Sequence, residues 1–136
     1  MAITLRVINR TRATVVCERL ELAATSRERS RGLLGRQRLE AGAGMLFAAG
    51  RFTTFLWMHM FFMRFPIDIV FLDRKGKVLK INHRLMPWRL SSIVFGARHA
   101  LEIEAGAAKR SRTEVGDQII LEGSPREGLP PSPKFP

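Results

Sequence analysis

The sequence has one cysteine, Cys17, and this scarcity limits the chemistry open to the protein. A single cysteine excludes an intrachain disulfide, and a chain of 136 residues can bury a core without one. Neither His nor Lys lies beside Cys17 to lower the pKa of its thiol. We therefore expect Cys17 to be a small buried residue of a strand and not a nucleophile.

Familiar catalytic and cofactor motifs are also missing. The chain has no H-E-x-x-H, C-x-x-C, G-x-S-x-G or Walker phosphate loop. Its three histidines, at 59, 83 and 99, lack the compact spacing of a zinc site. The sequence therefore predicts no metal site and no cofactor. The first residues show no basic segment followed by an apolar run, so a cytoplasmic location is expected.

Acidic residues are few. Twelve Asp and Glu stand against 23 Lys and Arg, which gives a net charge of +11. Such a surface favours polyanions, and one functional alternative is weak non-specific binding of nucleic acid or anionic membranes. The basic residues that would carry this binding are Arg6, Arg10, Arg12, Arg19 and the stretch from Arg27 to Arg38.

The composition, 46% hydrophobic and 26% charged, is typical of a folded globular protein. We predict one mainly β domain over residues 1–122, a compact antiparallel sandwich or sandwich-like barrel, and a Pro-rich irregular tail over 123–136. One main helix is expected at about 26–34 and a helical turn near 105–110. The predicted strands are 3–9, 14–22, 44–47, 55–60, 67–73, 78–85, 99–104 and 118–122; residues 86–97 are expected to form a long loop.

The longest apolar run organises the rest of the chain. Residues 52–72 are long enough to suggest a membrane span, but His59, Arg64 and Asp68 fall inside it. We therefore predict two buried strands and no membrane span. Residues 67–72 are apolar on both faces, with Asp68 on one of them, and Asp73–Gly76 is a strong hairpin turn.

Asp68 is the main candidate for a functional residue, because a buried carboxylate needs a partner. If strands 55–60 and 67–73 form a hairpin, His59 lies nearly opposite Asp68, and the two could act as acid and base. The structural alternative is that Asp68 accepts backbone N–H groups near Pro66, or pairs with a buried arginine. The candidate arginines are Arg31, Arg36 and Arg64.

The aromatic residues are expected to fill the core. Trp57 and Trp88 are both predicted to be core residues, and Trp88, in the irregular loop, is the better candidate for lining a pocket. His59 is expected to be an ordinary half-buried residue unless it takes part in catalysis.

Several segments together resemble one family. RGLLGR (31–36), GMLF (44–47), HMFFMRFPIDIVFLD (59–73), LEIEAG (101–106) and GD (116–117) resemble domain-of-unknown-function family 192, a group of small, mainly bacterial proteins. The resemblance covers about residues 3–122 and implies a compact β domain, but it implies no activity. Many members have Trp-Met-Lys-Asn where this chain has residues 59–62, His-Met-Phe-Phe.

These observations favour a binding or accessory module with a small polar pocket for an anionic or amphipathic ligand. The predicted ligand-binding residues are Arg31, Arg36, Met60, Arg64, Asp68 and Trp88. The alternative is an enzyme that uses Asp68 or His59 as acid or base, with Arg31 and Arg36 stabilising negative charge.

Overall fold

The computed structural model describes residues 5–23 and 38–123. In this part of the chain a seven-stranded sheet has the strand order β6-β5-β8-β3-β2-β1-β9. The strands are β1 (Leu5–Asn9), β2 (Thr14–Ala23), β3 (Ala43–Ala48), β5 (Ile67–Leu72), β6 (Val78–Leu85), β8 (His99–Glu104) and β9 (Ile119–Gly123). The prediction of a mainly β fold is confirmed, and the expected helix at 26–34 lies outside the described residues.

The sheet is mixed and not fully antiparallel. Strands β2 and β3 pair in parallel, with Leu20 opposite Gly44, whereas every other neighbouring pair is antiparallel. A parallel pair cannot be joined by a tight turn and needs a crossover connection. The expected purely antiparallel pairing is therefore corrected at β2 and β3.

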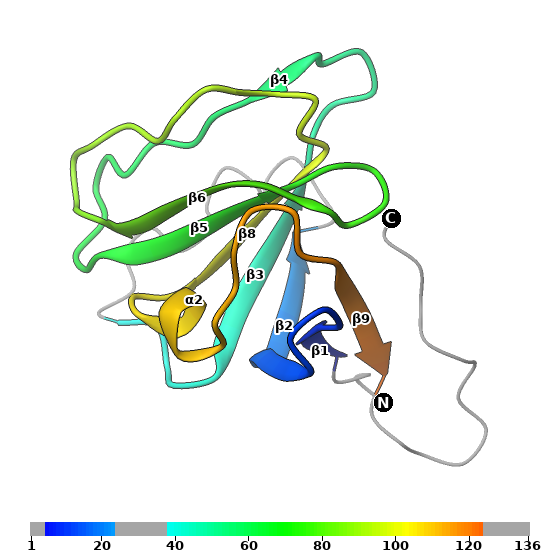
Figure 1. Cartoon of the computed structure of the whole chain (residues 1–136). Helices are drawn as coiled ribbons and strands as arrows, with labels where there is room; N and C mark the ends of the chain where they lie inside the picture. The colour runs from blue at the N-terminus through cyan, green and yellow to red at the C-terminus, as the bar shows by residue number, and fades with distance from the viewer. Residues whose placement is uncertain (1–4, 24–37, 124–136) are drawn as a thin grey trace.

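The sheet curls into a half-barrel, as Figure 1 shows. The turn between β5 and β6 meets the start of β9, where Gly76 C=O accepts the N–H of Ile119 at 2.9 Å and Lys77 bridges to Gln118. Asp73 shapes this turn, since its Oδ1 accepts the N–H groups of Lys75 and Lys77. The hairpin predicted at Asp73–Gly76 is therefore confirmed.

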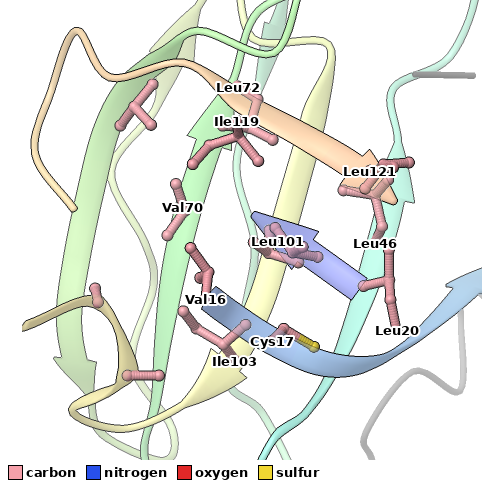
Figure 2. Close-up of a cluster of buried hydrophobic side chains, with 14 residues drawn as sticks. Val16, Cys17, Leu20, Leu46, Val70, Leu72, Leu101, Ile103, Ile119 and Leu121 are labelled. Carbon is pink, nitrogen blue, oxygen red and sulfur yellow. The ribbon is translucent and has the colours of Figure 1, made fainter. Parts of the chain in front are cut away.

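The inner face of the curl holds one hydrophobic core (Figure 2). Side chains from β2, β3, β5, β8 and β9 meet there, and Cys17 lies among them with 1% exposure. Burial raises the pKa of the Cys17 thiol to about 11, although a hydrogen bond to the backbone of Arg19 acts in the opposite direction. Cys17 is a buried structural residue, as expected.

The outer face of the sheet carries a second core, which two short strands help to cover. Strand β4 (Phe55–Leu56) pairs antiparallel with β7 (Val94–Phe95) in a separate two-stranded sheet. Leu56, Met58, Met60 and Val94 pack against outer-face residues of β3, β5 and β8. Residues 54–60 and 88–95 therefore form an outer layer, seen around β4 in Figure 1, away from β1 and β9.

This arrangement corrects two expectations. The strand predicted at 55–60 is regular only over β4 and does not form a hairpin with β5, which pairs with β6 and β8. The loop predicted at 86–97 contains β7 and an isolated bridge from Leu90 to His59.

The short helical turn is confirmed as α2 (Ala107–Arg110). None of the helices within residues 5–23 and 38–123 is long and apolar enough to cross a bilayer.

Candidate functional site

Asp68 is completely buried, and its carboxylate is held by backbone N–H groups from two other segments. Oδ1 accepts the N–H of Arg84 at 2.7 Å, and Oδ2 accepts the N–H groups of Gly106 and Ala108 at 3.0 Å each. The β5–β6 register shifts between Ile67 and Ile69, which leaves an irregular backbone opposite Asp68. Asp68 thus ties this irregular end of β6 to the first turn of α2.

The structural alternative for Asp68 fits this geometry, although its donors lie on β6 and α2 and not near Pro66. Both oxygens are already engaged, and three N–H bonds can stabilise a carboxylate away from water. His59 is exposed, and its Nδ1 accepts the N–H of Phe61 at 3.2 Å. Within the described part of the chain, no hydrogen bond joins His59 to Asp68, because the hairpin that would align them does not form.

The remaining predicted site residues are divided between the core and the surface. Met60 is fully buried in the second core, whereas Arg64 and Trp88 are exposed, Trp88 to 58%. Arg31 and Arg36 lie outside the described residues. Met60 and Trp88 are nevertheless neighbours, because Met60 C=O accepts the N–H of Trp88 at 2.7 Å and Met60 N–H donates to Arg89 C=O at 2.8 Å.

A second buried carboxylate, Glu102, was missed from the sequence. It lies on β8 between Met45 of β3 and Ile69 of β5, is 5% exposed, and faces the second core. Among the described residues no hydrogen bond or ion pair reaches its carboxylate. Desolvation raises the pKa of Glu102 to about 8, so the group is mostly protonated at neutral pH.

The expectation that the aromatic residues fill the core is wrong for much of the outer layer. Ten large apolar side chains in or beside it are exposed by 39% to 90%. We call this set the aromatic face: Phe52, Phe55, Trp57, Phe61, Phe62, Met86, Trp88, Leu90, Ile93 and Phe95. The outer layer is thus apolar towards the core and apolar again on the side exposed to solvent.

The aromatic face is locally ordered. Phe55 and Phe95 are cross-strand partners with ring centroids 5.7 Å apart. Trp88 contacts Phe62 at 4.8 Å and Phe61 at 6.1 Å between centroids. Phe62 and Trp88 both have positive φ, 64° and 66°, a conformation that bulky side chains rarely adopt. Such positions in a folded protein often belong to a functional surface.

The charges near this face have one sign. The sequence has no acidic residue between Glu40 and Asp68 and none between Asp73 and Glu102, and both parts of the outer layer fall within these intervals. Arg89 lies in the outer layer, Arg51 and Arg64 lie close to its first segment in the sequence, and Arg98 donates to the C=O groups of Thr53 and Gly50 next to that segment. This one-sided pattern was visible in the sequence, but only the fold joins the two intervals into one surface.

Known proteins are similar to the chain in sequence. A UPF0127 protein of Thermococcus sibiricus is 32% identical over 128 residues, which cover 93% of this chain and 81% of the relative. One of Pyrococcus abyssi is 36% identical over 62 residues, which cover 46% of this chain and 52% of the relative.

Two solved structures are similar at 28% identity. A putative transcription regulator of Sinorhizobium meliloti matches with a TM-score of 0.69 over 89% of this chain and 92% of that one. A protein of unknown function from Novosphingobium aromaticivorans matches with a TM-score of 0.71 over 86% and 84%. The relatives therefore include archaeal and bacterial proteins. The model of domain-of-unknown-function family 192, described as uncharacterized ACR, matches residues 7–121, and the chain belongs to this family.

Proposed function

We propose that this protein is a non-enzymatic binding module that takes an anionic, amphipathic ligand on its aromatic face. One observation carries the proposal: ten large apolar side chains are exposed in or beside the outer layer, and its two segments contain Arg89 but no acidic residue. Solvent-exposed apolar patches of this kind mark interaction surfaces more often than chance. Of the ligand-binding residues predicted from the sequence, Met60, Arg64 and Trp88 belong to or support this surface.

The proposal gives Asp68 a supporting part. A carboxylate that already accepts three backbone N–H groups has little capacity left to bind a ligand or transfer a proton. Its contribution is to hold β5, β6 and α2 together beneath the binding layer. The expected polar pocket around Asp68 is therefore replaced, in our proposal, by a surface above Met60. We retain the cytoplasmic location as part of the proposal.

Catalysis is the weaker alternative. An acid or base must reach a substrate proton, and here the buried carboxylates face cores while His59 lies apart from Asp68 in the hydrogen-bond network. Glu102 has a shifted pKa, which is a frequent property of catalytic acids. However, no hydrogen bond or ion pair within the described residues joins its carboxylate to a second polar group.

A soluble single-chain amphiphile tests the proposal directly. Trp57 and Trp88 are the two tryptophans of the chain and both lie on the aromatic face, so their fluorescence reports on its environment. Dodecyl phosphate below its micelle concentration should shift their emission to shorter wavelength and bind more tightly than dodecyl maltoside. Inorganic phosphate alone should not shift it. No shift with dodecyl phosphate, or equal binding of inorganic phosphate, would reject the proposal.

Nucleic acid is a second candidate ligand, favoured by the net charge of +11 and by the name of the Sinorhizobium meliloti relative. Exposed rings beside arginines can stack on unpaired bases. The described residues include only a four-residue helix, α2, which is too short to act as a recognition helix. Binding of a single-stranded oligonucleotide that falls steeply with salt and requires Trp88 would favour this candidate.

A further inference from the structure

We propose that the ligand of the aromatic face is the surface of a bilayer that contains anionic lipids. This inference rests on the proposed function and names its partner. A bilayer offers negative headgroups and, slightly deeper, an apolar layer. The aromatic face offers groups that complement both: arginines for the headgroups, and exposed rings and aliphatic chains for the apolar layer.

The aliphatic members of the face favour lipid over nucleic acid. Met86, Leu90 and Ile93 are exposed by 51%, 55% and 61% and lie in the same connection as Trp88. Bases stack on flat rings, and branched or flexible aliphatic chains add little to such stacking. Acyl chains and the headgroup boundary accept aliphatic and aromatic side chains alike. Tryptophan is enriched at this boundary, and both tryptophans of this chain are on the face.

The basic residues favour an anionic surface over an apolar protein partner. Within residues 5–23 and 38–123, Arg64 and Arg89 form no ion pair, whereas the ion pairs of Arg6, Arg12 and Arg110 lie on other parts of the fold. Arg51 lies over the ring of Phe52, 5.8 Å from its centroid, and Phe52 is 90% exposed at a turn. Guanidinium groups beside rings can bind phosphate while the rings enter the apolar layer.

The backbone presents the rings in a fixed arrangement. Phe61 and Phe62 lie on a turn closed by the N–H of Met63 donating to Met60 C=O at 3.2 Å, and the same carbonyl accepts the N–H of Trp88. The turn that carries Phe61 and Phe62 is therefore hydrogen-bonded to the backbone of Trp88, and the rings of Phe62 and Trp88 are in contact. A surface that is ordered before binding loses less conformational freedom on binding.

The test uses the full chain and vesicles of phosphatidylcholine with or without phosphatidylglycerol. Binding is measured by co-sedimentation and by tryptophan emission. The wild-type protein should bind the anionic vesicles at least about tenfold more tightly than the neutral ones, and added salt should weaken this preference.

Two double variants separate the apolar and the electrostatic contributions. Phe62→Asn with Trp88→Asn removes two rings at positive-φ positions that asparagine tolerates, so the fold should be kept. This variant should bind both kinds of vesicle at least about tenfold more weakly than wild type. Val115→Asn is its control, because Val115 is 62% exposed outside the aromatic face.

Arg64→Glu with Arg89→Glu should abolish the preference for anionic vesicles. Arg10→Glu with Lys109→Glu changes the net charge equally at exposed positions outside the outer layer and should reduce binding much less. Equal losses in the two charge-reversed variants would mean that the overall charge and not this face binds the vesicles, and would overturn the inference.

Other outcomes also decide the question. If wild-type protein binds dodecyl phosphate but no vesicle, the proposed function stands and the bilayer is excluded as its partner. If it binds neither amphiphile nor vesicle, both proposals fall. If a single-stranded oligonucleotide binds and the Phe62–Trp88 double variant abolishes that binding while vesicles do not bind, the face is a nucleic-acid surface. Thermal unfolding of every variant is measured to check that the fold is retained.

Discussion

Each face of the curled sheet holds a buried carboxylate, and the two carboxylates differ in their hydrogen bonding. At the end of the inner face, Asp68 accepts three backbone N–H bonds, and the chain is shaped around it by an irregular β5–β6 register and by α2. On the outer face, Glu102 lies between Met45 and Ile69 of the neighbouring strands and has no hydrogen-bonding partner among the described residues. Two carboxylates that are both buried thus differ in their hydrogen bonding, because N–H groups of the described residues point at only one of them.

The outer face is also covered differently. The inner core is enclosed by the strands of the half-barrel itself, with β9 opposite β5 and β8 in Figure 2. The outer core is covered in part by a thin two-stranded layer that has a second apolar side in solvent. We infer that the inner face provides stability and that the outer layer provides binding, and the following predictions test that division and the contrast between the carboxylates.

The largest effect is expected at Asp68. Asp68→Ala removes the acceptor of three buried N–H groups, and breaking such an arrangement should lower the free energy of unfolding by about 3–5 kcal/mol. Urea denaturation measures the change. Asp68→Asn keeps one carbonyl acceptor and should fall between Asp68→Ala and wild type. An Asp68→Ala protein as stable as wild type would show that the inner face does not depend on this carboxylate.

The second effect is a pH dependence from Glu102. Its folded-state pKa, about 8, lies above its ordinary value of 4.5, because burial disfavours the charged form. The unfolded chain therefore releases this proton first, and stability that is complete below pH 4.5 is lost as the pH rises towards 8, by roughly 4 kcal/mol. Glu102→Met should remove this loss and be more stable than wild type at pH 8.

Glu104→Gln is the matched control for Glu102, since Glu104 lies on the same strand but pairs with Arg110 at 3.1 Å near the surface. This variant should keep the wild-type slope of stability against pH between 5 and 8. A slope unchanged in Glu102→Met would mean that Glu102 is ionised in the folded protein, and the contrast between the two carboxylates would disappear.

Asp117 provides a smaller effect of opposite sign. Desolvation acts to raise the pKa of Asp117, but hydrogen bonds from Asn9, Arg12 and the N–H of Glu114 outweigh it and lower the pKa below its usual range. Its contribution is therefore present above the unfolded-state pKa and lost as the pH falls through the folded-state value. Asp117→Asn should cost about 1–2 kcal/mol at pH 7 and flatten the acid side of the stability curve.

The sequence predicted the parts of the fold whose signals are local. The Asp73–Gly76 turn, the two-sided apolar strand β5 and the short turn at α2 depend on neighbouring residues, and all three are confirmed. The pairing of β4 was predicted wrongly, because β4 and β7 are far apart in the sequence and short adjacent strands also suggest a hairpin. Proximity in the chain favoured β5 as the partner, whereas the fold uses β7.

The candidate site was predicted less well for a related reason. Phe and Trp in an apolar run look the same to sequence reasoning whether they fill a core or cover its outside. In the outer layer, Met58 and Met60 face the second core while Phe55 and Trp57 face solvent, and only the position of the layer above the sheet decides which side is which. Glu102 was missed because alternation in a strand usually places a carboxylate in water.

The smallest expected change in stability, at Phe62 and Trp88, is the most direct test of the division between the inner face and the outer layer. Phe62→Asn and Trp88→Asn each place a residue that tolerates positive φ where a bulky ring now stands, so each should change the free energy of unfolding by less than about 1 kcal/mol, and in the stabilising direction. The rings are exposed by 68% and 58%, and their contact with each other provides little burial to lose. Thermal and urea unfolding measure the change, and Met60→Ala, which empties a fully buried position beneath them, is the destabilising reference at about 2–5 kcal/mol. If the asparagine variants were as unstable as Met60→Ala, the rings would belong to the core, and the outer layer would be a structural cover and not a binding surface.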